Sequence, residues 1–189
     1  PHLVTDRDKP GVIAVNQRAV RFVNESSSYH HFASAMQRAA ENAPCFLLCD
    51  AQVMKRYGLG LARPAPVNND ALVAAGYLHK ADTLAALAQQ LGLDAQTLSE
   101  TVARYNRDAA QGVDREFAKG GNSYNRAIRA ISLTPVMPPC SARRSMPSNS
   151  IPAIWGLLEV WSPPPMPRSS TLKATPLRGC TRWETTWIR

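Results

Sequence analysis

A polar stretch at residues 21–31, with the sequence RFVNESSSYHH, holds the side chains of this chain that are best suited to chemistry. It follows a run typical of a strand and precedes a helical pattern, a position from which a scaffold delivers functional groups to a cleft. Tyr29 is the candidate catalytic residue, because a phenol is both donor and acceptor and can exchange a proton with carbon when its anion is stabilised. Asn24, Glu25 and Ser26 are the candidate substrate-binding residues, and a second interpretation is that Asn24 and Glu25 fix the loop.

The same stretch also has a purely structural interpretation. The serines at 26–28 are of the residue type that caps helices, and Tyr29 can pack beside them. His30 and His31 are adjacent, so they cannot both face one metal ion from the same side of a helix. We therefore expect no metal site here, and the catalytic and capping interpretations of the stretch both stay open.

Two blocks of sequence carry a resemblance to a known family. The first is GVIAVNQRAVRFVNES at residues 11–26 followed by Tyr29, and the second comprises DTL at 82–84, LGLD at 91–94, TVARYN at 101–106, GVD at 112–114 and Phe117. In this order they resemble FAD-dependent oxidoreductases of the fumarate reductase/succinate dehydrogenase flavoprotein and 3-ketosteroid dehydrogenase family. In that family, a Tyr shortly after Asn-Glu-Ser is the proton-transfer residue of the ketosteroid branch, so the resemblance favours that branch.

The resemblance implies a two-domain enzyme, with a dinucleotide-binding domain that holds FAD and an α+β cap domain that closes over the substrate. We assign residues 1–30 to the end of the FAD-binding domain and the join, residues 31–128 to the cap domain, and residues 129–189 to a tail without a native domain. The chain begins with Pro1, and we expect it to start inside a longer protein. Because the family's Gly-x-Gly-x-x-Gly segment is missing, this fragment should not bind FAD tightly.

The activity implied for the intact parent is FAD-dependent dehydrogenation of a 3-ketosteroid-like small molecule next to its ketone, with the fragment itself inactive. One alternative is a fumarate or succinate oxidoreductase, in which Arg21, Arg38 and the histidines at 30–31 clamp a dicarboxylate. Another is a non-catalytic interaction module with a basic tail. The sequence gives no indication of the oligomeric state.

The composition changes at about residue 129. Ten of the fifteen prolines and all four tryptophans lie in the last sixty residues, where no helical or alternating pattern persists. Read one base earlier, the possible codons of residues 145–156 permit FYAVKLYPGDLG and those of residues 179–187 permit GLYAVGNDM, and both strings resemble the family's return segment. We therefore expect an out-of-frame tail that is disordered or irregular.

The net charge of +8 lies mostly in this tail, where residues 130–189 hold seven Lys or Arg and two acids. No basic helix with interleaved aromatic residues occurs, so we expect no nucleic-acid partner. No apolar run is long enough to span a bilayer and no signal peptide is present, which predicts a soluble, cytoplasmic protein. The four cysteines lack metal-binding spacing, and we expect buried thiols at Cys45 and Cys49.

The local patterns predict several elements. Residues 12–15 and 20–23 have the pattern of a hairpin, with Ala19 in the turn where family members usually have Gly. A helix is expected after Tyr29 and before Pro44, a buried strand at 45–49, and helices at 82–91 and from Asp94 to Gly112. Tyr105 has the helical spacing of a core residue. Gly58-Leu59-Gly60 lacks the third glycine of a phosphate loop and is interpreted as a plain loop.

Overall fold

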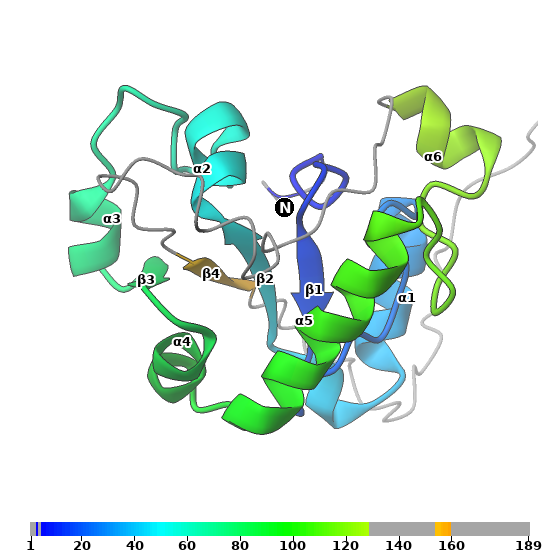
Figure 1. Ribbon diagram of the computed structural model, residues 1–189, viewed down its shortest axis with the longest axis horizontal. Helices are drawn as coiled ribbons and strands as arrows, with labels where there is room; N and C mark the ends of the chain where they lie inside the picture. The colour runs from blue at the N-terminus through cyan, green and yellow to red at the C-terminus, as the bar shows by residue number, and fades with distance from the viewer. Residues whose placement is uncertain (1–2, 4, 129–153, 160–189) are drawn as a thin grey trace, which may run out of the picture.

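The computed structural model describes residues 3, 5–128 and 154–159 of the chain (Figure 1). All described strand pairs are antiparallel, and the sheet has the order β1-β2-β4-β3. The expected mixture of helices and strands is confirmed. The elements are β1 (Ile13–Val15), α1 (Tyr29–Gln37), η1 (Ala40–Asn42), β2 (Cys45–Asp50), α2 (Ala51–Tyr57), α3 (Asp70–Ala74), β3 (Leu78–Ala81), α4 (Leu84–Leu91), α5 (Ala95–Ala110), α6 (Ser123–Ile128) and β4 (Ile154–Glu159).

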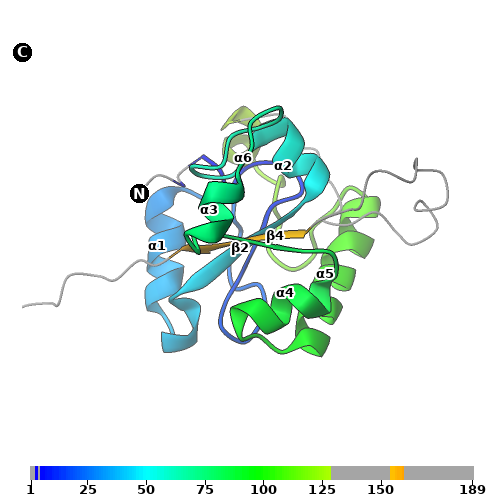
Figure 2. The ribbon, with the colours of Figure 1, turned by 90° about the vertical axis from the view of Figure 1, so that its left-hand side faces the viewer.

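Helices cover both faces of the sheet, and Figure 2 shows α2 and α3 on one side of β2 and β4 with α4 on the other. Alternate residues of a strand point to opposite faces, so β2 contributes to two cores. Leu47 packs with α1 and α2 residues, whereas Leu48 packs with α4 and α5 residues. The first core includes Phe32, Met36 and Val53, and the second includes Leu87, Leu98 and Tyr105.

Helix α1 forms where the apolar periodicity predicts it. Phe32, Ala35 and Met36 are buried along one side of the helix. Of the three preceding serines, Ser28 is the cap, since its Oγ accepts a hydrogen bond from His31 N at 3.3 Å. The capping interpretation therefore holds for one serine, and Tyr29 becomes the first residue of the helix.

The predicted hairpin is wrong in its second half, because residues 20–23 form no strand and β1 pairs with β2 instead. The Asn16 side chain explains the difference. Its Oδ1 accepts hydrogen bonds from Arg18 N at 3.0 Å and Val20 N at 3.2 Å, which closes a tight turn. Ala19 in that turn has a φ of +60°, the conformation for which family members usually carry Gly. The chain therefore leaves the sheet before Arg21.

Helices α2, α4 and α5 also begin at side-chain caps. Asp50, Thr83 and Asp94 each accept a hydrogen bond from a backbone N–H of the first turn of their helix. Tyr105 is 1% exposed, which confirms its expected place in the core. The sequence did not predict η1, α3, β3 or α6. Within the part of the chain described here, no helix is long and apolar enough to cross a membrane.

Cys45 and Cys49 are buried in β2 as thiols, as expected, and Cys140 and Cys180 lie outside the described residues. Burial raises the pKa of the Cys49 thiol, and the neighbouring Asp50 raises it further. A thiol held protonated in this way is a poor nucleophile and a poor metal ligand. The two cysteines therefore act as small core residues.

Strand β4 lies in the range that the sequence assigns to an irregular tail. It pairs with β2 on one side and β3 on the other, so its backbone N–H and C=O groups are satisfied whatever its side-chain pattern. Helix α4 approaches it closely, since a Cβ on Gly156 would lie 3.2 Å from Leu91 Cδ1. The expectation of an irregular tail is thus wrong at 154–159. Residues 129–153 and 160–189, which hold the rest of the predicted out-of-frame segment, lie outside the described residues.

Candidate active site

Tyr29 lies at the start of α1 and is half-buried. Within the described part of the chain its hydroxyl has no hydrogen-bond partner. The Ser28 cap and the buried Phe32 fix the helix from which the phenol projects. The hydroxyl is therefore placed on a rigid element with both its donor and its acceptor unused.

Glu25, a predicted substrate-binding residue, is instead fully buried in a group of charges that we call the ionic cluster, formed by Arg21, Glu25, Asp114 and Lys119. Arg21 donates to both carboxylates in a two-pronged manner, at 2.8 and 2.9 Å to Glu25 and at 3.0 and 2.9 Å to Asp114. Lys119 Nζ lies 3.6 Å from Glu25 Oε2 and donates to Val12 O at 2.5 Å. The two cations and two anions balance.

The protonation states in the cluster follow from these contacts. Burial alone would raise the pKa of the Glu25 carboxyl, but Arg21 and Lys119 outweigh it and hold that pKa below its usual value. Asp114 behaves in the same way, with its pKa lowered by Arg21 against the effect of burial. Burial lowers the pKa of the Lys119 ammonium, and Glu25 opposes this. Both carboxylates are therefore ionised and serve as hydrogen-bond acceptors.

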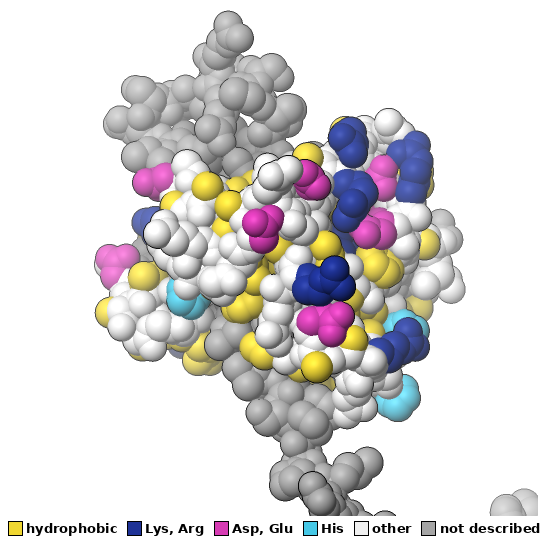
Figure 3. Space-filling model, turned by 90° about the horizontal axis from the view of Figure 1, so that it is seen from below, with side chains coloured by type: hydrophobic (Ala, Val, Ile, Leu, Met, Phe, Trp, Pro, Cys, Tyr) yellow, Lys and Arg dark blue, Asp and Glu magenta, His cyan; other side chains and the backbone are white. Residues whose placement is uncertain are grey.

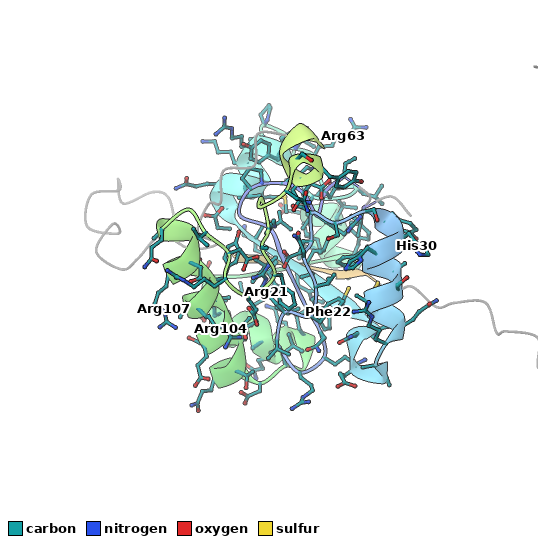
Figure 4. All side chains as sticks on the ribbon, turned by 90° about the vertical axis from the view of Figure 1, so that its right-hand side faces the viewer. Arg21, Phe22, His30, Arg63, Arg104 and Arg107 are labelled. Atoms are coloured by element: carbon teal, nitrogen blue, oxygen red, sulfur yellow. The ribbon has the colours of Figure 1, made fainter. Side chains whose placement is uncertain are left out.

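The guanidinium of Arg21 is also enclosed by aromatic rings. It lies 5.0 Å from the ring centroid of Tyr105 and 5.0 Å from that of Phe117, within the range of cation–π attraction. Figure 4 shows Arg21 and Phe22 between α5 and α1, whereas Arg104 and Arg107 project outward from α5. Four N–H groups of Arg21 are bonded to carboxylates and its Nη1 also lies 3.6 Å from Glu116 Oε2, so Arg21 is poorly placed to clamp a dicarboxylate.

Asn24 and Ser26 bind the same loop to α6 and to the segment before it. Asn24 Nδ2 donates to Phe117 O and to Asn125 Oδ1, both at 3.1 Å, and its Oδ1 accepts from Ser26 N at 2.9 Å. Asn125 Nδ2 donates to Ser26 O at 2.7 Å. Ser26 Oγ is buried without a hydrogen-bond partner among the described residues. The two residues therefore hold the loop that leads to Tyr29.

A pocket of about 460 Å³ lies beside this loop, and we call it the Phe22 pocket. Of the four predicted site residues, Asn24 lines it, whereas Glu25, Ser26 and Tyr29 do not. The structure therefore brings residues 24–26 together in one loop but keeps the Tyr29 hydroxyl out of this pocket. The lining residues are Phe22, Val23, Asn24, Ser27, His31, Arg38, Phe117, Ala118, Gly121 and Asn122.

The loop after α5 supplies partners that the sequence did not identify as part of the site. Asp114 accepts hydrogen bonds from the backbone N–H groups of Glu116, Phe117 and Lys119 as well as from Arg21. Asp114 and Phe117 belong to the second block of the family resemblance, and that membership was the available signal. Lys119 and Asn125 carried no signal of their own.

Comparisons with known proteins also find a matching family and several relatives. A family model described as an FAD binding domain matches residues 2–152. A 4-oxocyclohex-2-ene-1-carboxylate 5-dehydrogenase of Sinomonas cyclohexanicum is 40% identical over 119 residues, which are 61% of this chain and 20% of that protein. A 3-oxosteroid 1-dehydrogenase of Mycolicibacterium smegmatis is 34% identical over 131 residues, which are 65% of this chain and 23% of that protein.

Among solved structures, the 3-ketosteroid Δ1-dehydrogenase of Sterolibacterium denitrificans, in complex with 1,4-androstadiene-3,17-dione, aligns with a TM-score of 0.67 at 30% identity. The alignment covers 82% of this chain and 28% of that one. This chain therefore spans between a fifth and a third of the length of these relatives.

Two helix starts in the described part of the chain do not fit the pyrophosphate of a dinucleotide. A pyrophosphate binds at an open helix N-terminus behind a glycine-rich turn. Here α2 and α5 begin with carboxylate caps, Asp50 and Asp94, which would repel an anion. Gly58 and Gly60 follow the end of α2 and precede no helix N-terminus directly.

Proposed function

Because the chain belongs to the family of FAD binding domain proteins, we propose that its intact protein is an FAD-dependent dehydrogenase of cyclic ketones of the 3-ketosteroid kind. In this proposal a ring carbon beside the ketone loses a proton to Tyr29. The family's FAD supplies the two-electron oxidant. Residues 31–128 belong to the domain that closes over the substrate, and Asn24, Glu25 and Ser26 hold the loop that carries Tyr29.

The observation that carries this proposal is the placement of Tyr29. It is the first residue of a helix that is capped and packed, and its hydroxyl is not consumed by another described residue. A general base must be able to meet a substrate proton directly, so an unpartnered hydroxyl on a rigid element suits the role. The similarity to dehydrogenases whose names specify an oxocyclohexene ring and an oxosteroid supports the substrate class.

A chimera tests the proposal. Residues 11–127 would replace the matching segment of the Sinomonas dehydrogenase, and turnover would be measured with its ring ketone, a 3-oxosteroid and fumarate. We expect turnover of a ring ketone, and Tyr29→Phe should lower it by about 100- to 10,000-fold while the flavin absorption spectrum is retained. His30→Gln is the matched control for ring-ketone turnover, since His30 is the exposed neighbour of Tyr29 and has no role in the proposed ring-ketone chemistry.

Near-normal turnover in the Tyr29→Phe chimera would remove Tyr29 from the mechanism. Activity with fumarate alone, in a chimera that retains flavin, would contradict the ring-ketone assignment. That alternative is weakened by Arg21, because four of its N–H groups are bonded to Glu25 and Asp114 and its Nη1 also lies 3.6 Å from Glu116 Oε2.

A further inference from the structure

Two basic side chains, one in α1 and one at its C-cap, line the Phe22 pocket. His31 lies in α1 and Arg38 is the C-cap of this helix. They are seven residues apart, about two helical turns, so they lie on the same side of the helix axis. At about 100° per residue, both are roughly opposite Tyr29 around the helix axis. The pocket and the Tyr29 hydroxyl are therefore on different sides of α1.

The charge in this pocket is not neutralised by the described residues. Both His31 and Arg38 are exposed, and neither side chain forms an ion pair or hydrogen bond within the described part of the chain. No Asp or Glu is among the lining residues. A guanidinium with a free fork of donors matches the two oxygens of a carboxylate. The polar part of the pocket is thus suited to an organic anion.

The remaining wall is aromatic, and its rings are held in place. Phe22 packs against Phe32 with ring centroids 5.7 Å apart and an interplanar angle of 52°. Phe117 has the guanidinium of Arg21 over its ring at 5.0 Å. Fixed aromatic rings offer a large apolar surface at little entropic cost. This part of the pocket is suited to a ring or another compact apolar body.

We propose that the Phe22 pocket binds a small carboxylate carried on an apolar ring, at a site separate from Tyr29. The carboxylate pairs with Arg38 and His31, and the ring lies against Phe22 and Phe117. The volume of about 460 Å³ is within the range of about 300–1,000 Å³ usual for small-molecule sites. This site is independent of the proposed dehydrogenase chemistry.

The test uses the 189-residue chain and isothermal titration with cyclohexanecarboxylate as the probe. The neutral isostere cyclohexanecarboxamide tests the need for charge, and acetate tests the need for the ring. We expect the ring carboxylate to bind at least tenfold more tightly than either of them. Arg38→Gln should weaken its binding about tenfold or more, as expected for loss of a charged hydrogen-bond donor.

Arg107→Gln is the charge-matched control, because Arg107 is exposed on α5 and does not line the pocket. Unchanged binding in this variant and in Tyr29→Phe is expected. Three results would overturn the inference: no binding of the ring carboxylate, equal losses in Arg38→Gln and Arg107→Gln, or a large loss in Tyr29→Phe, which would merge the pocket with the proposed active site. His31→Gln gives an independent second variant, for which weaker binding is expected and unchanged binding would remove His31 from the site.

Discussion

Arg21 precedes α1 and Arg38 directly follows it, and the two side chains have opposite surroundings. The Arg21 side chain is fully buried, bonded to two carboxylates and enclosed by two aromatic rings. Arg38 is exposed at the edge of the Phe22 pocket and has no bonded partner among the described residues. The first arginine joins segments of the protein, and the second has its donors free for a ligand.

The difference teaches that residue type alone does not identify a binding site. Burying a guanidinium is costly unless its charge and donors are compensated, and Glu25 and Asp114 provide that compensation. Once compensated, the group has nothing left to offer a substrate. Exposed charges elsewhere pair at varied distances, with Arg104 3.4 Å from Glu116 but Arg115 2.7 Å from Asp108. The face in Figure 3 intermixes basic and acidic side chains.

The largest expected difference in stability is between two single variants that carry the same substitution, one at each arginine. Arg21→Met leaves the carboxylates of Glu25 and Asp114 buried with only Lys119 to balance them, and should lower the free energy of unfolding by about 3–5 kcal/mol. Arg38→Met touches no described ion pair and should change it by less than about 0.5 kcal/mol. Urea unfolding followed by circular dichroism measures both.

A loss of less than about 1 kcal/mol for Arg21→Met would show that the cluster is not a stabilising joint. A comparable loss in Arg38→Met would contradict the view that only Arg21 stabilises the fold.

The response to acid should also come from the ionic cluster. The pKa values of Glu25 and Asp114 are lowered in the folded protein, chiefly because Arg21 outweighs the effect of burial. The folded state therefore binds protons less readily than the unfolded state. Their contribution is complete above the ordinary carboxyl range of about 4 and is lost as the pH falls through that range toward the lowered values.

Urea unfolding at a series of pH values from 7 to 2 measures this loss. Asp114→Asn removes one of the two carboxylates, so its free energy of unfolding should fall less steeply below pH ~4 than that of the unmodified chain. Parallel curves for the two proteins would contradict the role given to Asp114.

The smallest effect concerns the helix that carries Tyr29. Ser28→Ala removes the cap of α1 and should lower the free energy of unfolding by about 1 kcal/mol, far less than Arg21→Met. Ser34→Ala, inside the same helix, is the matched control and should be neutral or slightly stabilising, since Ala is the better helix former. Thermal or urea unfolding of the two variants measures this difference. Equal losses of unfolding free energy would show that Ser28 does not act as a cap.

The local elements could be predicted from sequence because their causes are local. The spacing of Phe32, Ala35 and Met36 and the caps Asp50 and Asp94 are patterns within a few residues of one another. The missing strand at 20–23 depended on one side chain, since Asn16 closes its turn by bonding the backbone. β-Propensity carries no information about such a bond.

The ionic cluster could not be predicted because Asp114 lies 93 residues from Arg21 in the chain. Arg21 could be recognised as a cation and Asp114 as part of a family block, but only the fold brings them together. For the same reason Glu25 was predicted as a substrate ligand, whereas its contacts are those of a buried ion pair. The role of Tyr29 stays a prediction, because no described contact requires it.

The position of β4 has a consequence for the order of folding. The sheet pairs Cys45 of β2 with Glu159, so one edge of β2 stays open until the chain beyond residue 154 has been made. At a synthesis rate of ~5–20 residues per second this leaves an unpaired edge for several seconds. Strand β3 also stays unpaired until β4 has been made, since its described pairing is with β4. The nascent chain is thus most exposed to edge-to-edge association while the segment between β2 and β4 is being made.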